Sequence, residues 1–279
     1  MIDFLFSIFR FIRPLNICLG VSTCFLVSYL LDFNNFNRFF DLCIVLVCYM
    51  VAGNMLNDVL DVEIDRINKP HRFLIKHSIN RLYVFISITA LFFIGSLVAF
   101  KLPVIAQRLV LFFILPLMIL YEALFKRMPL LGNIIISFLV GSVFIYTEAS
   151  LNGEIFITRK IFILAFMLNL IREIIKDIQD IKGDKSNNFN TLPIVAGLPF
   201  TILFLRTISF IFIVISMNSF YSQSYSPYYI PLILFSIHIP LLYIMWRLRV
   251  NITTKECDNF SQFLKLMIIN GMVIILLSS

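Results

Sequence analysis

The stretches Asn57-Asp-Val-Leu-Asp-Val-Glu-Ile-Asp65 and Lys176-Asp-Ile-Gln-Asp-Ile-Lys-Gly-Asp184 share one spacing of aspartates, and each follows a long apolar run. Eight of the 16 Asp and Glu residues of the chain lie within residues 57–65 and 172–184. Carboxylates beside the hydrocarbon core of a membrane are costly and are usually functional. The two acidic clusters therefore predict a site that gathers divalent cations around a polyanion.

The composition around these clusters is that of a multi-pass integral membrane protein. The chain is 60% hydrophobic and 14% charged, and its mean hydropathy is +0.94, whereas a soluble domain is roughly 25% charged. We expect an all-α membrane protein, a single domain over residues 1–279, with nine spans around a central cavity. The predicted spans are residues 15–31, 39–57, 83–101, 105–123, 129–148, 158–176, 194–216, 228–246 and 262–278.

The distribution of Lys and Arg predicts the orientation of the chain. Fourteen lie in the segments 10–13, 66–81, 126–127, 182–185 and 247–255, and the opposite segments hold Arg38, Lys101, Arg159 and Lys160, or five residues if Arg108 is included. Positive charge favours the cytoplasmic side, so we expect both acidic clusters in cytoplasmic loops, in the inner membrane of the cell. The net charge of +7 predicts contact with anionic membrane lipid and phosphates, and it needs no nucleic acid.

The clusters are also related by a weak internal repeat. A shift of 119 residues brings Asp58, Asp61 and Asp65 onto the three aspartates of the second cluster. Such a repeat is typical of two related helical halves around a cavity.

On a helix, which turns about 100° per residue, positions i, i+3 and i+7 fall within roughly 60°. The two predicted stripes are Asp58, Asp61 and Asp65, and Asp177, Asp180 and Asp184. Asn54 and Glu173 extend the stripes, and Glu63 falls on roughly the opposite side. The last aspartate of each cluster is a candidate to lie past the helix end, above all Asp184 because it follows Gly183.

Hard oxygen ligands of this kind suit Mg²⁺, which one or two carboxylates and substrate phosphates commonly hold. The stripes therefore predict Mg²⁺ ions that clamp a diphosphate and neutralise its charge as it departs. The basic residues placed by sequence to complete the clamp are Lys69, Arg72, Arg172 and Lys176. The alternative is that both clusters are solvated helix ends with charge pairs; two clusters of identical spacing favour the site.

The two stretches resemble the two aspartate-rich motifs of the UbiA superfamily of intramembrane prenyltransferases. The resemblance includes Ala52–Asp58 before the first motif, Asp65–Arg72 after it, Arg13–Asn16 before the first span and Thr191–Pro193 after the second motif. With the nine spans it extends over nearly the whole chain. It implies an enzyme that transfers a polyprenyl group from its diphosphate, with Mg²⁺ as cofactor, to a lipid-soluble acceptor.

Within that superfamily, the stretch Asn169–Asp184 is most similar to digeranylgeranylglyceryl phosphate synthases. The resemblance implies Mg²⁺-diphosphate roles for Asn57, Asp58, Asp61, Asp65, Asp177, Asp180 and Asp184, of which Asp58, Asp61, Asp177 and Asp180 are the predicted catalytic residues. It implies phosphate-binding roles for Lys69, Arg72, Arg172 and Lys176, and a substrate-binding role for Tyr121 and Lys126. The prenyl group would be geranylgeranyl and the acceptor geranylgeranylglyceryl phosphate.

Three alternatives stay open at the level of the sequence. In the first alternative, the acceptor is an aromatic acid of quinone synthesis instead of a prenylglyceryl phosphate. In a different class, the chain is a transporter whose acidic pairs bind cations, although such carboxylates are expected near the middle of a span. A third alternative is an isoprenoid-binding protein without activity.

Overall fold

The computed structural model describes residues 9, 11–68, 72–77, 79–187, 189–223 and 226–278. Within these ranges every regular element is a helix, which confirms the predicted all-α class. The chain divides into two compact units. Unit 1 contains Met1–Ala123 and Tyr146–Phe156, and unit 2 contains Leu124–Ile145 and Ile157–Ser279. Each unit therefore carries one of the two acidic clusters.

Unit 1 is a set of packed helices whose starts are set by local chemistry. Its elements are α2 (Pro14–Leu30), α3 (Phe36–Leu60), α4 (Val62–Asn68), α5 (Phe73–Lys76), α6 (Arg81–Ala99), α7 (Val104–Leu109), the π-helical η1 (Val110–Ile114), α8 (Leu115–Ala123) and the end of α9 (Leu131–Asn152). The side chain of Asn35 accepts the N–H of Arg38 at 3.1 Å and so caps α3. Asn80 caps α6 in the same way by accepting the N–H of Leu82 at 2.9 Å. Each such cap stabilises a helix by about 1 kcal/mol.

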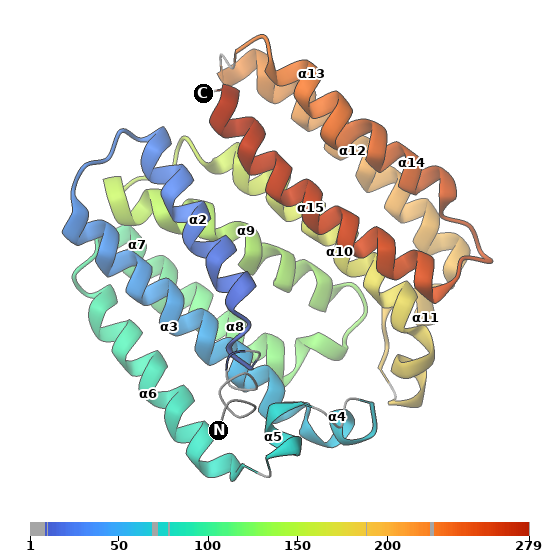
Figure 1. Ribbon diagram of the computed structural model, residues 1–279, viewed down its shortest axis with the longest axis horizontal. Coiled ribbons are helices and arrows are strands. Elements are labelled where there is room, and N and C mark those ends of the chain that lie inside the picture. Colours follow the sequence, from blue (N-terminus) through green and yellow to red (C-terminus); the bar gives the residue numbers. More distant parts are fainter. Residues whose placement is uncertain are drawn as a thin grey trace. The chain divides into compact units, whose positions relative to one another are not determined.

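The first acidic cluster lies on a packed support within unit 1. Helix α6 packs along α3, and α4 and α5 lie at the C-terminal end of α3, which carries the cluster (Figure 1). The buried side chains that join these helices are Phe11, Ala52, Met55, Leu56, Val59, Val62, Leu74, Val84 and Ile88. Val59 and Val62 alternate with the aspartates, so the apolar core fixes the segment that carries the acidic cluster.

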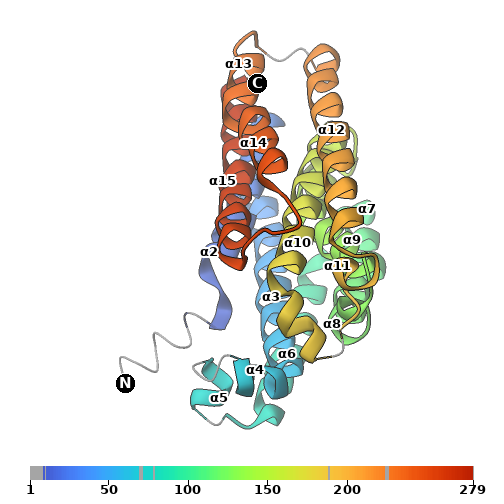
Figure 2. The same ribbon diagram turned by 90° about the vertical axis from the view of Figure 1, so that its right-hand side faces the viewer.

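Unit 2 places its helices around the long helix that carries the second cluster. Its elements are η2 (Phe125–Arg127), most of α9, α10 (Arg159–Ser186), α11 (Leu192–Val195), α12 (Leu198–Gln223), α13 (Tyr229–Ile233), the π-helical η3 (Leu234–His238), α14 (Ile239–Arg247) and α15 (Thr254–Ser278). Helix α10 packs against α12 and, most extensively, against α15, and Figure 2 shows α10 and α15 along one another.

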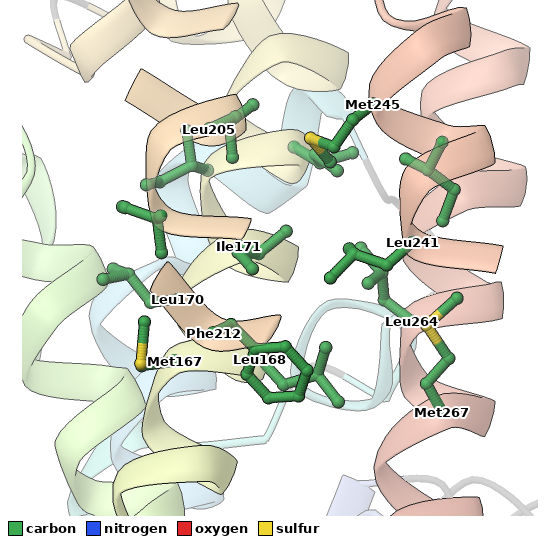
Figure 3. Close-up of a cluster of buried hydrophobic side chains, with 14 of the residues drawn as sticks. Met167, Leu168, Leu170, Ile171, Leu205, Phe212, Leu241, Met245, Leu264 and Met267 are labelled. Carbon is green, nitrogen blue, oxygen red and sulfur yellow. The ribbon is translucent and has the colours of Figure 1, made fainter. Parts of the chain in front are cut away.

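The core of unit 2 is formed where α10, α12, α14 and α15 meet (Figure 3). The side chains labelled there are Met167, Leu168, Leu170 and Ile171 from α10, Leu205 and Phe212 from α12, Leu241 and Met245 from α14, and Leu264 and Met267 from α15. All ten are buried. This core holds the apolar face of α10, and the polar side chains of that helix lie outside it.

One long helical segment in each unit contains a π-helical turn just before a proline. In unit 1 the turn η1 precedes Pro116, the second residue of α8, and in unit 2 the turn η3 precedes Pro240, the second residue of α14. Proline has no N–H to donate and its ring crowds the preceding turn, which widens the helix there. The predicted spans 105–123 and 228–246 are therefore each interrupted near their middle.

Seven helical segments of the described chain are long and apolar enough to cross a membrane. They are Phe36–Leu60, Arg81–Ala99, Val104–Ala123, Leu131–Asn152, Leu198–Asn218, Tyr229–Arg247 and Thr254–Ser278. The predicted count of nine is not confirmed. The first predicted span corresponds to α2, which has only 17 residues, and the sixth corresponds to the first part of α10, which has charged residues at both of its ends.

Candidate active site

The first cluster lies at a joint between two helices. Asn57 and Asp58 belong to the last turn of α3, Asp61 follows its end, and Asp65 belongs to α4. The backbone continues through the joint with little distortion, because the N–H of Asp61 donates to the carbonyl of Asn57 at 3.0 Å and that of Asp65 to the carbonyl of Asp61 at 2.8 Å. The predicted stripe therefore lies on two helices that meet at Asp61, and not on one continuous helix.

Two arginines bind the carboxylates of this cluster. Nη2 of Arg13 lies 2.6 Å from Oδ1 of Asn57 and 2.6 Å from Oδ1 of Asp58. Nη1 of Arg72 lies 2.9 Å from the same oxygen of Asp58 and 2.6 Å from Oδ2 of Asp65. Asp58 is 7% exposed and Asp65 is 4% exposed, and carboxylates that deeply buried need such partners to stay ionised. Arg72, one of the predicted phosphate-binding residues, thus contacts two aspartates of this cluster.

Arg13 is a member of the cluster that sequence reasoning missed. Its backbone is in the left-handed region, with φ 54°, directly before Pro14, a conformation that is strained for a residue with a side chain. The side chain of Asn54 donates to the carbonyl of Ile12 at 3.0 Å and so fixes the chain just before Arg13. Two signals in the sequence pointed to Arg13: it directly precedes the proline that starts the first predicted span, and Arg13–Asn16 is part of the family resemblance.

Asn57 connects the cluster to α8. Its Nδ2 donates to Oε2 of Glu122 at 2.8 Å and lies 3.4 Å from Oδ2 of Asp61. The predicted residue Tyr121 lies next to Glu122 in α8, and Lys126 lies in η2 of unit 2. The sequence predicts roles for Tyr121 and Lys126 but none for Glu122. The predicted residue Lys69 lies outside the described residues.

Glu63 lies apart from the buried carboxylates, as the helical stripe predicts. Its carboxylate pairs with Arg81 and, at 3.7 Å, with Nη1 of Arg66. The hydrogen bond from Arg81, followed by the charge of Arg66, holds the pKa of Glu63 below its usual value. The side chain is largely exposed, so its contacts are those of a surface charge pair.

The second cluster lies on one continuous helix. Helix α10 extends to Ser186, so Asp177, Asp180 and Asp184 are all helical; the expectation that Asp184 lies past the helix end is wrong. The helix instead ends where Oγ of Ser186 and Nδ2 of Asn187 donate to the carbonyl of Gly183, at 2.7 and 2.8 Å.

Polar neighbours from α9 and the charges of α10 itself set the electrostatics of the second cluster. Nδ2 of Asn133, a residue that sequence reasoning missed, donates to Oδ2 of Asp177 at 2.9 Å and orients that carboxylate. Burial, followed by the charge of Asp180, raises the pKa of Asp184 to about 6. A bound cation would favour the ionised form of such a carboxyl group.

A charge triplet precedes the second cluster on α10. The carboxylate of Glu173 is paired with Nη1 of Arg172 at 2.5 Å and with Nζ of Lys176 at 2.9 Å. Nε of Arg172 also lies 3.3 Å from the carbonyl oxygen of Ser261 on α15. The predicted phosphate-binding residues Arg172 and Lys176 are therefore brought together by one acidic side chain.

These oxygen atoms fit Mg²⁺ held jointly with a phosphorylated ligand. No three His, Cys, Asp or Glu side chains converge on one metal position within the described part of the chain. Mg²⁺ needs no such cage, because one or two carboxylates with waters and substrate phosphates commonly hold it. Neighbouring Asp and Asn oxygens in unit 1, and the oriented carboxylate of Asp177 in unit 2, are donors of that kind.

Comparison with known proteins agrees with this assignment of chemistry. The sequence pattern of the UbiA prenyltransferase family matches residues 19–268. The digeranylgeranylglyceryl phosphate synthase of Methanothermobacter thermautotrophicus is 31% identical over 233 residues, which are 82% of this chain and 80% of that protein. The enzyme of the same name from Haloquadratum walsbyi is 40% identical over 149 residues, 53% of this chain and 51% of that protein.

Solved structures share the fold. A structure of digeranylgeranylglyceryl phosphate synthase in membranes has a TM-score of 0.82 and 24% identity, over 100% of this chain and 99% of that one. A UbiA homologue from Archaeoglobus fulgidus, bound to DMAPP and Mg²⁺, has a TM-score of 0.70 and 17% identity, over 95% of this chain and 98% of that one. With a family pattern that covers most of its length and both aspartate-rich clusters in place, this integral membrane protein belongs to the UbiA prenyltransferase family.

Proposed function

We propose that this protein transfers a geranylgeranyl group from geranylgeranyl diphosphate to geranylgeranylglyceryl phosphate. The observation that carries the proposal is the cluster in unit 1, in which Arg13 and Arg72 bind the buried carboxylates of Asp58 and Asp65. The choice of acceptor is supported by the curated relatives, which are named for a product with two geranylgeranyl groups on one glyceryl phosphate. An enzyme that makes this product by prenyl transfer adds the second group to an acceptor that already has one.

The reaction exchanges one carbon–oxygen bond for another. The bond between C1 of the prenyl group and the diphosphate breaks, the hydroxyl oxygen of the acceptor bonds to C1, and the hydroxyl proton is released. Bound Mg²⁺ supplies positive charge to the departing diphosphate. We propose as its ligands Asn57, Asp58, Asp61, Asp65, Asp177, Asp180 and Asp184, with Asp58, Asp61, Asp177 and Asp180 as the catalytic residues.

Basic and polar side chains bind the phosphate groups in this proposal. Arg13 and Arg72 are already held against the first cluster, where their guanidinium groups can bind diphosphate oxygens in a bidentate manner. The further residues proposed to contact substrate are Lys69, Tyr121, Lys126, Arg172 and Lys176.

An apolar cavity in unit 2 supports the proposal that the substrate is an isoprenoid. It is lined by residues of α9, α10, α12, α13, η3 and α15, among them Phe144, Ile161, Leu168, Phe212 and Gly271. Ile161 and Leu168 precede Asp177 by 16 and 9 residues on the same helix, so they lie roughly 24 and 14 Å from it along the axis. We propose that the far end of a geranylgeranyl chain enters this cavity.

The proposal includes the setting of the enzyme in the cell. The excess of Lys and Arg in the segments that follow the clusters supports cytoplasmic loops in the inner membrane. The family pattern runs through parts of both units without interruption, which supports one prenyltransferase domain over residues 1–279.

Incubation of the purified protein in lipid vesicles with radiolabelled geranylgeranyl diphosphate and Mg²⁺ tests the proposal. The acceptors are geranylgeranylglyceryl phosphate, 4-hydroxybenzoate and a naphthoate, and the control is the Asp58→Asn variant. We expect a labelled diether only with the glyceryl phosphate, loss of product with EDTA, and recovery with Mg²⁺ or Mn²⁺. Product with an aromatic acid alone would refute the acceptor, and full turnover in thoroughly chelated protein would refute the metal mechanism.

A further inference from the structure

Lys265 is a charged residue in an apolar part of unit 2. It is the only Asp, Glu, Lys or Arg between residues 259 and 279 of the sequence, and it lies in α15, one of the helices long and apolar enough to cross a membrane. Its side chain is half-buried. Because a charge within such a helix is costly, a functional role is its default interpretation.

The packing of α15 on α10 brings Lys265 to the charge triplet. Arg172 contacts Ser261 at 3.3 Å, and Gln179 contacts Asp258 at 3.3 Å, so the two helices run antiparallel. Lys265 is one turn beyond Ser261 and therefore lies level with the turn of α10 that contains Arg172. Its charge interacts with those of both Arg172 and Lys176.

The polar stripe of α10 thus has a basic edge and an acidic edge. With about 100° per residue, Arg172 and Lys176 lie within about 40° of one another, and Asp177 and Asp184 lie about 120–140° round the helix from Arg172. Asp180, about 80° from Arg172, lies between the two edges. The contacts agree with this division. Arg172 bonds to α15, while Asp177 bonds to Asn133 of α9.

The basic edge suits an anion that binds without a metal. Arg172 and Lys176 pair with the carboxylate of Glu173, and the charge of Lys265 interacts with those of Arg172 and Lys176. Three positive charges and one negative charge leave an excess of two among these four residues. The side chains of Arg172 and Lys176 are 22% and 39% exposed, so a ligand can reach them. Three neighbouring cations repel a divalent metal ion, whereas a phosphate monoester carries about two negative charges at neutral pH.

We propose that Arg172, Lys176 and Lys265 bind the phosphate group of the acceptor, and that Lys265 makes the enzyme specific for a phosphorylated acceptor. The inference deepens the proposed function and rests on it for the identity of the acceptor. Glu173 is a positioning residue here, because its carboxylate holds Arg172 and Lys176 side by side.

Steady-state kinetics test the role of Lys265 in specificity. Lys265→Met is compared with Lys265→Arg and with Lys255→Met, which removes an exposed lysine of the same helix. The substrates are geranylgeranylglyceryl phosphate and its dephosphorylated form. We expect Lys265→Met to raise the acceptor KM about tenfold or more, to leave the KM for geranylgeranyl diphosphate within about twofold, and to weaken the preference for the phosphorylated acceptor. Lys265→Arg and Lys255→Met should keep that preference.

A binding measurement on the wild-type protein depends neither on turnover nor on the folding of variants. Amine-reactive methylation of Lys265, followed by mass spectrometry, should be slowed by glycerol 1-phosphate and not by glycerol, with Lys255 as the internal control. Equal labelling with and without glycerol 1-phosphate, or an unchanged acceptor KM in Lys265→Met, overturns the proposal. If the wild type rejects the prenylglyceryl phosphate yet glycerol 1-phosphate protects Lys265, the phosphate site stands and the proposed acceptor falls.

Discussion

The guanidinium group of Arg13 donates to Oδ1 of Asp58 at 2.6 Å, and this joins the residue before α2 to the first acidic cluster. The contact spans 45 residues of sequence. It holds the strained backbone before α2 against the end of α3, so the position of α2 and the orientation of the Asp58 side chain depend on each other.

Replacement of Arg13 by Met is expected to lower both stability and turnover. The variant loses charge-assisted hydrogen bonds to Asn57 and Asp58, each of which typically contributes about 1.5–3 kcal/mol, while Arg72 continues to neutralise Asp58. Thermal inactivation in detergent and the KM for the prenyl diphosphate measure the two effects. Arg108→Met, at an exposed position of α7, is the matched control, and equal behaviour of the two variants would contradict the assigned role.

Asp61 and Glu63 are two residues apart, but we expect their replacement by alanine to have very different effects on turnover. Asp61→Ala should lower turnover about a hundredfold or more, because it removes electrostatic stabilisation at the diphosphate. Glu63→Ala should have little effect, because its exposed carboxylate pairs with Arg81 and Arg66. Single-turnover rates at saturating Mg²⁺ provide the comparison, and losses of similar size at both positions would disprove the assignment of the acidic face.

The stabilisation of the protein by Mg²⁺ is expected to depend on pH through Asp184. Its pKa of about 6 in the folded protein exceeds the value of about 4 in an unfolded chain. The proton therefore stabilises the fold fully below about pH 4, and this stability is lost as the pH rises through about 6. Since Mg²⁺ competes with the proton, the rise in Tm caused by Mg²⁺ should be larger at about pH 7.5 than at about pH 5. Asp184→Asn should reduce that difference. An identical pH dependence in the variant would show that Asp184 is not the group that links Mg²⁺ binding to pH.

Gly271 is a position at which the apolar cavity of unit 2 can be filled. A Cβ atom there would meet Cδ1 of Ile237 at 3.7 Å, an ordinary contact, so a larger side chain extends into the cavity without a backbone clash. Gly271→Leu should shift the preference towards a prenyl diphosphate one isoprene unit shorter by about tenfold, the usual scale of discrimination by a filled apolar pocket. Competition between the two labelled diphosphates measures the shift. Val273→Leu, at an exposed position of α15, should leave the preference unchanged.

The fold class was predictable because composition and periodicity are local properties of the sequence. Long apolar runs require helices in a membrane, and the described helices lie close to the predicted spans. The exact ends of the helices were not predictable. A glycine costs a helix only about 1 kcal/mol, and at Gly183 the side chains of Ser186 and Asn187 close the helix one turn later.

The partners of the candidate site residues were less predictable than the residues themselves. The spacing of the aspartates identified the acidic faces, because that spacing follows from helix geometry alone. Glu122 contacts Asn57 across 65 residues, and Asn133 contacts Asp177 across 44. Such contacts depend on which helices pack together, and a single sequence does not contain that information.

The π-helical turn at Val110–Ile114 determines how this helical segment tolerates the loss of one residue. A π turn contains one residue more than an α turn, so loss of a residue there is accommodated by an ordinary helix without a break. The wide turn already holds the extra residue, so later residues of the segment keep nearly the same direction relative to α7 after its loss. Glu122, eight residues and roughly 12 Å beyond Ile114, would then still face Asn57. Loss of a residue within Leu115–Tyr121, where the helix is regular, would instead rotate Glu122 by about 100° and turn it away from Asn57.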